Sequence, residues 1–114
     1  MPSPLSEKQF QAQVIDLLHL YGYRVAHFTP AVNLRGQWRT PIAADGKGFP
    51  DLVAVRPDLP EQRRPGRLLF IELKSDTGRL SKEQREWGAD LSSSGHESYV
   101  WKPKDWQAIK EVIR

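Results

Sequence analysis

Residues 68–75 read Leu-Leu-Phe-Ile-Glu-Leu-Lys-Ser and constrain the fold more than any other part of the chain. An apolar run of this length with Phe and Ile in it is typical of a strand buried on both faces. Side chains alternate along a strand, so we expect Glu72 and Lys74 on one face and Leu73 on the other. The sequence therefore predicts a core strand that ends with a carboxylate and an ammonium group side by side.

A second apolar strand is predicted over residues 51–56, with Asp51 at its entrance after Gly48-Phe49-Pro50. The Pro-rich segment 57–66 predicts a hairpin connection between this strand and the strand at 67–75. In such a hairpin Asp51 lies opposite the end of the second strand, within side-chain reach of Glu72. A Glu-x-Lys pair alone is most often a pair of solvated charges, and the carboxylate of Asp51 is what favours a functional site here.

The remaining segments alternate between helical and strand patterns. Ser6 with Gln9, and Ser81 with Gln84, fit capping boxes that open two helices. The expected elements are a helix over 7–21, a strand over 23–29, a helix over 82–93, a strand over 98–101 and a helix over 104–113. With the hairpin between them, the order α-β-β-β-α-β-α predicts one α/β domain over residues 1–114.

Composition excludes several classes of protein. The 114 residues include no cysteine, so disulfides and thiolate metal sites are excluded, which fits a reducing cytoplasmic location. No apolar run approaches the length of a membrane span, so no membrane partner is expected. The net charge of +3 suits a polyanionic partner, and between residues 35 and 85 eleven Lys and Arg face seven Asp and Glu.

The chemistry that the hairpin brings together suits a divalent cation. The carboxylates of Asp51 and Glu72, with the backbone carbonyl of Ile71, would form an oxygen-rich site for Mg²⁺ or Mn²⁺. Such an ion polarises a phosphoryl oxygen and lowers the pKa of a bound water. Lys74 would orient that water or stabilise charge at phosphorus. No phosphate-binding glycine loop, nucleophile elbow or zinc-spaced histidine pair competes with this set.

A long segment without clear period covers residues 30–47 and has two interpretations. Its basic and aromatic residues suit contacts with the backbone and bases of a nucleic acid. The alternative is a solvated loop with Trp38 packed against the body of the protein. The residues expected to bind DNA are Arg35, Trp38, Arg39 and Lys47.

These pieces together resemble a known nuclease signature. Pro50-Asp51 followed, after a hairpin, by Glu72-Leu73-Lys74 resembles the PD-(D/E)xK pattern, and the chain as a whole is similar to the VRR-NUC domain of stand-alone phage and bacterial proteins. The similarity also covers residues 6–11 at the first helix and 80–84 at the next. It implies a restriction-endonuclease-like core, in which a mixed central sheet is flanked by helices.

The resemblance also implies roles for individual residues. Asp51 and Glu72 would be metal ligands and Lys74 the catalytic lysine. The family uses an acidic residue on the first helix, which here is Glu7, or the position of Gln11 one turn further along. Gln84 would match a glutamine near the lysine, and its alternative role is that of a capping-box residue. From spacing alone, Glu7 and Gln11 read as ordinary polar residues of a helix surface.

The resemblance implies a metal-dependent, structure-selective DNA endonuclease in a bacterial or phage-infected cell, most simply a Holliday-junction resolvase. A resolvase cuts two symmetric strands, so it should be a two-fold homodimer, and Trp101 and Trp106 are the expected interface residues. The alternatives are a monomeric flap or duplex nuclease, a junction-binding module without catalysis, and a structural domain whose charges meet by coincidence.

Overall fold

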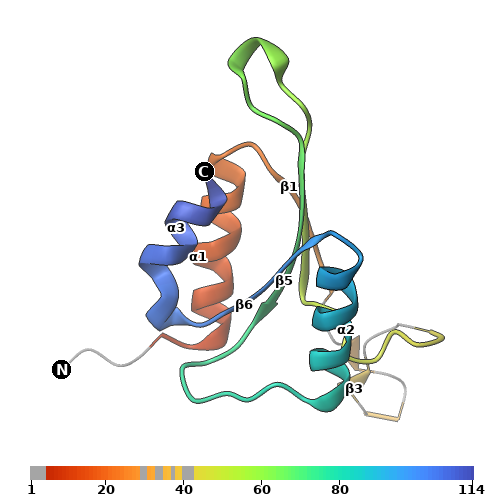
Figure 1. The fold of residues 1–114 in the computed structure, drawn as a ribbon. Helices are drawn as coiled ribbons and strands as arrows, with labels where there is room; N and C mark the ends of the chain where they lie inside the picture. Colours follow the sequence, from red (N-terminus) through yellow and green to blue (C-terminus); the bar gives the residue numbers. More distant parts are fainter. Residues whose placement is uncertain (1–4, 29–30, 33–34, 37, 40–42) are drawn as a thin grey trace.

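The computed structural model describes residues 5–28, 31–32, 35–36, 38–39 and 43–114 (Figure 1). The helices are α1 (Glu7–Leu20), α2 (Lys82–Ser93) and α3 (Trp106–Ile113), with short 3-10 turns at Pro60–Gln62 and Pro103–Asp105. The strands are β1 (Arg24–His27), β2 (Ala31–Val32), β3 (Trp38–Arg39), β4 (Leu52–Arg56), β5 (Arg67–Leu73) and β6 (Glu97–Trp101). These elements form an α/β fold in line with the predicted nuclease core.

A four-stranded sheet in the order β1-β4-β5-β6 forms the centre. β1, β4 and β5 are antiparallel neighbours, whereas β6 runs parallel to β5 after the crossover through α2, so the sheet is mixed as expected. The predicted hairpin is confirmed, because β4 pairs with β5 from Leu52 opposite Ile71 to Arg56 opposite Arg67. The connection of this hairpin projects away from the rest of the sheet at the top of Figure 1.

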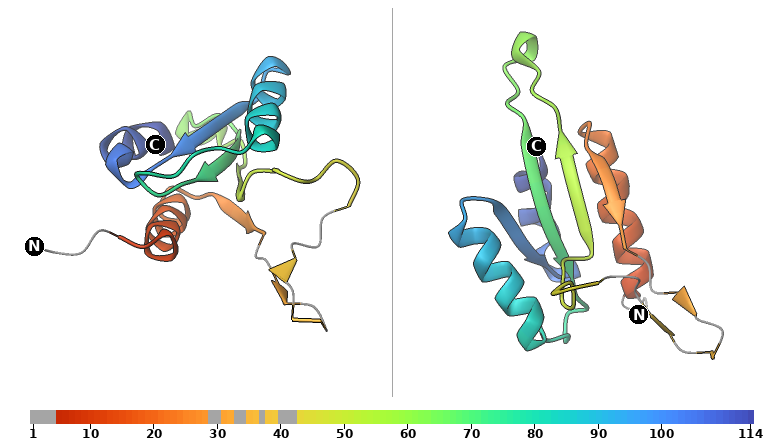
Figure 2. Two further views of the ribbon diagram at one scale, coloured as in Figure 1. Left: turned by 90° about the horizontal axis from the view of Figure 1, so that it is seen from below. Right: turned by 90° about the vertical axis from the view of Figure 1, so that its right-hand side faces the viewer.

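The core lies on the face of the sheet that α1 and α3 cover. Figures 1 and 2 show these two helices on one side and α2 on the other. Both predicted capping boxes are present, so α1 and α2 start where the sequence indicates. The apolar stripes of α1 and α3 pack on alternate residues of β4 and β5, and the fully buried side chains are Phe10, Val14, Leu18, Leu52, Ala54, Leu69, Ile71, Ile109 and Ile113.

Among the described residues, aromatic side chains cover the opposite face near the end of β5. There Phe49 makes edge-on ring contacts with Phe70 and Trp87, at centroid distances of 6.1 and 5.1 Å. Further along, the cross-strand neighbours Val55 and Leu68 are 42% and 36% exposed. The expectation of a strand buried on both faces is therefore wrong at Leu68, because α2 is too short to reach it.

Further expectations also differ from the structure. The segment 30–47 contains a small two-stranded ladder, since β2 pairs with β3. The strand at 23–29 extends only over β1, and the last helix begins as a 3-10 turn at Pro103. Trp101 is 5% exposed and belongs to the core, so it is not a surplus surface residue for a dimer interface. Trp106 also packs against the core.

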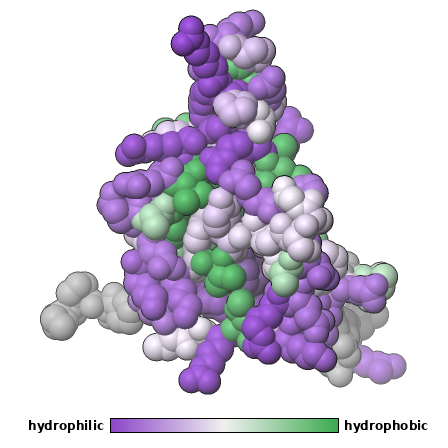
Figure 3. Space-filling model, in the orientation of Figure 1, coloured by the Kyte–Doolittle hydropathy of each residue, from purple (hydrophilic) through white to green (hydrophobic). Residues whose placement is uncertain are grey.

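The surface of the described part is largely hydrophilic. In the view of Figure 3, apolar groups emerge as separate patches between polar side chains. The large apolar residues exposed by more than a third are Leu5, Leu20, Phe28, Val55, Leu68 and Val100. Among the helices that the structure describes, none has the length and apolar character that crossing a membrane requires.

Candidate active site

Asp51, Glu72 and Lys74 meet at one end of the central sheet, as the sequence predicts. Asp51 immediately precedes β4, and Glu72 is the second-last residue of β5. Because Leu52 stands opposite Ile71, continuing the antiparallel register places Asp51 opposite Glu72. The backbone N–H of Phe28 donates to the carbonyl of Asp51 at 3.2 Å, so the chain after β1 also fixes this position.

The Asp51 carboxylate is held by the backbone of the neighbouring strand. Its Oδ2 accepts a hydrogen bond from the N–H of Leu73 at 2.9 Å. β4 begins only at Leu52, so on the β4 side no strand residue stands opposite Leu73 to complete the ladder. The side chain of Asp51 takes the place of that missing partner, and a bond to an ionised acceptor is stronger than a neutral one.

Glu72 is a buried carboxylate, with 6% of its surface exposed. Its Oε1 accepts a hydrogen bond from Nε2 of Gln84 at 2.9 Å. The pKa of Glu72 is raised to about 8: burial is the largest cause, the charge and side-chain hydrogen bonding of nearby Asp51 add to it, and Lys74 partly offsets them. Buried beside the carboxylate of Asp51, Glu72 therefore favours its protonated form at neutral pH.

Gln84 has both of the roles that the sequence left open. Its Oε1 accepts from the N–H of Ser81 at 2.8 Å, while the N–H of Gln84 donates to Oγ of Ser81 at 3.1 Å. The same amide presents its Nε2 to Glu72, so the side chain caps α2 and orients a site carboxylate at once. The residue it contacts is Glu72 rather than Lys74.

Gly48 brings the segment before Asp51 into close contact with the first turn of α2. Its φ is +84°, and a Cβ at this position would lie 2.6 Å from the carbonyl carbon of Glu83 and 2.7 Å from the N of Gln84. Only glycine fits such a distance together with this φ. The close approach fixes Asp51 and Gln84 relative to each other.

Lys74 follows β5 directly and is half-buried. Its backbone N–H donates to the carbonyl of Trp101 at 3.0 Å. A Cβ added to Gly78 would lie 3.4 Å from both Cβ and Cδ of Lys74, so the glycine leaves room for the lysine stem. The ammonium group is near enough to Glu72 to lower the pKa of that carboxyl.

On the first helix, Gln11 contacts the strand next to β4, and its role at the site stays a prediction. Nε2 of Gln11 lies 3.1 Å from Nδ1 of His27, and His27 pairs with Leu52, the residue after Asp51. Glu7 is exposed in the first turn of α1. Among the residues that the structure describes, no three His, Cys, Asp or Glu side chains gather as a metal site, so Glu7 does not join Asp51 and Glu72 here. Its role as a ligand stays a prediction.

The donor set nevertheless fits a hard divalent cation. Burial and the neighbouring carboxylate of Asp51 raise the pKa of Glu72, and Mg²⁺ or Mn²⁺ would supply the positive charge that stabilises its ionised form. Both ions prefer oxygen ligands and retain water. Asp51 and Glu72 are the residues that would hold the ion, and the carbonyl of Ile71 stays the predicted third ligand.

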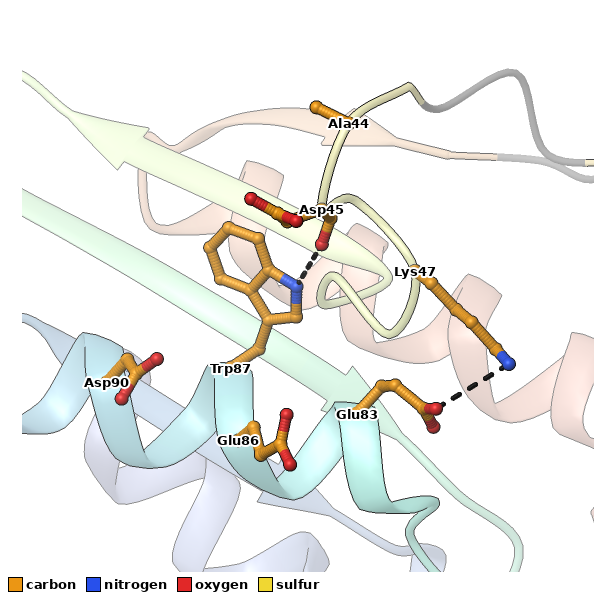
Figure 4. A pocket seen from close by; sticks show the side chains of 7 residues that line it. All are labelled: Ala44, Asp45, Lys47, Glu83, Glu86, Trp87 and Asp90. Atoms are coloured by element: carbon orange, nitrogen blue, oxygen red, sulfur yellow. Dashed lines mark hydrogen bonds and ion pairs between the residues drawn. The ribbon is translucent and has the colours of Figure 1, made fainter.

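Lys47, predicted to bind DNA, lies among carboxylates. It forms an ion pair with Glu83 at 3.5 Å, and both line a hollow of about 550 Å³ between the loop 43–47 and α2 (Figure 4). The indole Nε1–H of Trp87 donates to the backbone carbonyl of Asp45 at 3.0 Å and so closes one wall of the hollow. Further carboxylates from Glu86 and Asp90 make this hollow unfavourable for a phosphate.

The other predicted DNA contacts are only partly described. Arg35 is exposed. Trp38 and Arg39 form β3, and their side chains lie outside the described part of the chain. A second hollow lies on the Lys74 side of α2. The sequence did not indicate it as a site, because its residues come together only through the pairing of β5 with β6. It is lined by Lys74, Gly78, Arg79, Leu80, Arg85, Val100 and Lys102.

Comparison with known families gives one match. The family model described as the VRR-NUC domain matches residues 34–105. The matched range includes Asp51, Glu72, Lys74 and Gln84, and it excludes α1 with Glu7 and Gln11. No curated protein and no solved structure matches the chain.

Proposed function

This chain belongs to the VRR-NUC domain family and is a nuclease-type protein whose substrate is DNA, and we propose that it is a metal-dependent, structure-selective endonuclease. The observation that carries the proposal is the buried carboxyl group of Glu72 beside the half-buried Asp51, with Lys74 next to it. Burying a carboxyl group beside a second carboxylate is costly in a purely structural role, and strongly shifted carboxyl groups concentrate at functional sites.

Each residue of the site has a defined part in phosphodiester hydrolysis. When bound, the Mg²⁺ or Mn²⁺ ion would supply a Lewis acid and lower the pKa of a water molecule. Asp51 is preset by its bond from Leu73, and Glu72 by its bond from Gln84, so neither carboxylate must reorganise. Lys74 places a positive charge where negative charge develops on the phosphoryl oxygens.

The substrate we propose is a four-way DNA junction. The support is the resemblance to stand-alone members of the family, and the proposal requires a homodimer, because two symmetric strands are cut. The alternatives are a monomeric nuclease for flaps or duplexes and a junction-binding module without catalysis. They differ in what is cut and in whether cutting depends on Lys74.

The test is a cleavage assay with labelled four-way junction, flap and linear duplex in Mg²⁺ or Mn²⁺. Lys74→Ala should lower the cleavage rate by about a hundredfold or more while the stability to unfolding hardly changes. Arg63→Gly is the matched control: it removes one positive charge at the far hairpin turn, where Arg63 has a φ of +53° that glycine adopts readily.

Each outcome of the assay separates the alternatives. Paired symmetric cuts on the junction, lost in Lys74→Ala and kept in Arg63→Gly, support the resolvase. Lysine-dependent cuts on flaps or on every duplex keep the nuclease and reject the resolvase. Absence of lysine-dependent cutting on all three substrates overturns the nuclease in favour of the binding module.

A further inference from the structure

We propose that the hollow on the Lys74 side of α2 is a second phosphate-binding site. It holds a phosphodiester of the DNA backbone that neighbours, on the same strand, the phosphodiester being cut. We call it the basic hollow; its cationic residues are Lys74, Arg79, Arg85 and Lys102. The proposal rests on the proposed function for the identity of its ligand. Only Lys74 among these residues belongs to the nuclease signature.

Three separate segments bring these charges together. Lys74 and Arg79 lie in the connection after β5, and Arg85 lies in the first turns of α2. Lys102 follows β6, and the bond from the N–H of Lys74 to the carbonyl of Trp101 places it beside Lys74. The parallel pairing of β5 with β6 therefore builds the cluster from positions far apart in the sequence.

Three of the four cations of the basic hollow, all but Lys74, have no acidic partner in the part of the chain that the structure describes. No carboxylate lines the hollow, and within the described residues no Asp or Glu forms an ion pair with Arg79, Arg85 or Lys102. Arg85 is partly fixed, because its Nη1 donates to the carbonyl of Leu80 at 3.0 Å. Positive groups held together in this way repel one another, and a bound phosphate relieves that repulsion.

The size and walls of the hollow suit a nucleotide backbone. Its volume is about 370 Å³, and Gly78, Leu80 and Val100 form its uncharged walls. Val100 is 41% exposed, which gives a deoxyribose an apolar surface to contact. Arg and Lys bind phosphate oxygens by charge-assisted hydrogen bonds.

α2 separates two hollows of opposite sign. The side shown in Figure 4 presents carboxylates of α2, whereas the basic hollow contains Arg85 from the same helix. A DNA strand at the site is repelled by the first and attracted by the second. Lys74 lines the basic hollow and also acts on Glu72. The DNA strand therefore passes from Asp51 and Glu72 into this hollow.

The test measures DNA binding without metal, so it does not depend on catalysis. Fluorescence anisotropy with a labelled four-way junction in EDTA would compare wild type with Arg79→Gln/Lys102→Gln. We expect about tenfold weaker binding and a salt dependence shallower by about one to two released ions. The control Arg63→Gly/Lys82→Gln removes the same charge outside the hollow, since Lys82 pairs with Glu86 on α2. It should change affinity less than about twofold.

The outcomes separate this inference from the proposed function. If the hollow variant binds like wild type while wild type cuts DNA, the second site is refuted and the nuclease stands. If the wild type cuts no DNA but the hollow variant binds DNA more weakly than the wild type, the nuclease is refuted and the phosphate site stands. Equal losses in the hollow and control variants would show that net charge alone is responsible, and would overturn the proposal. Thermal unfolding of each variant checks that it is folded.

Discussion

Replacing Glu72 with Gln should stabilise the metal-free protein, and the gain should depend on pH. The pKa of Glu72 is about 8 in the folded protein against an ordinary 4.5, chiefly because of burial and then because of Asp51. The folded state therefore holds a proton that the unfolded state releases between these two values. Wild-type stability is complete below pH 4.5, falls as pH rises to about 8, and then levels off.

The size of the effect follows from the interval between the two pKa values. Each pH unit corresponds to about 1.4 kcal/mol, so ionising Glu72 costs on the order of 4 kcal/mol at pH 8 and above. Glutamine has nearly the same shape, still accepts from Gln84 and carries no charge. For a domain of this length, the variant should unfold roughly 15–20 °C higher than wild type at pH 9, with almost no difference at pH 4.5.

The assay is thermal unfolding in EDTA from pH 4.5 to 9, repeated in saturating Mg²⁺ or Mn²⁺. Metal should stabilise wild type by about 3 kcal/mol at a hundred times its Kd and so reduce the advantage of the variant. Glu97→Gln is the matched control of opposite sign. Its bond to Arg67, with oxygen to nitrogen distances of 2.6 and 3.0 Å, lowers the pKa of Glu97, so that variant should lose stability above the ordinary value of 4.5. A pH-independent difference between Glu72→Gln and wild type would refute the reasoning.

Three further changes test single contacts. Gly48→Ala should cost roughly 2–4 kcal/mol in urea unfolding, because its Cβ would meet the backbone of α2 at 2.6 Å and φ is +84°; a loss below half that would contradict the close contact. Gln84→Ala should lose about 1–2 kcal/mol and slow cleavage, because capping and the bond to Glu72 disappear together. Gln84→Glu keeps the cap but places a carboxylate against Glu72. Above pH 8 this variant should be less stable than wild type without metal and should regain that stability only in Mg²⁺, as unfolding with and without the metal would show.

Features set by neighbouring residues could be predicted from the sequence. The two capping boxes need only a Ser and a Gln three residues apart, and both are present in the structure. The meeting of Asp51 with Glu72 needs only that consecutive strands form a hairpin, because the register then follows from the connection. Sequence reasoning therefore found the central carboxylates and Lys74.

Features that depend on which helix covers which face could not be predicted. Trp101 alternates along β6 like any strand residue, and only the packing of α1 and α3 decides that its face is the buried one. Lys47 looks like a free cation in the sequence, yet α2 places Glu83 beside it. Arg79 and Lys102 become neighbours of Lys74 through the crossover to β6, which no local pattern reveals.

The hydrogen bond from the N–H of Leu73 to Asp51 lets hydrogen exchange at this amide report on the site. Amide protons in a ladder exchange with deuterated water when the ladder opens, but the proton of Leu73 is protected by a side chain instead. The proton of Ser81 is likewise held by Gln84. The exchange rates of these two amide protons therefore report, without any substrate, how often the contact of Asp51 or that of Gln84 opens while the surrounding sheet stays folded.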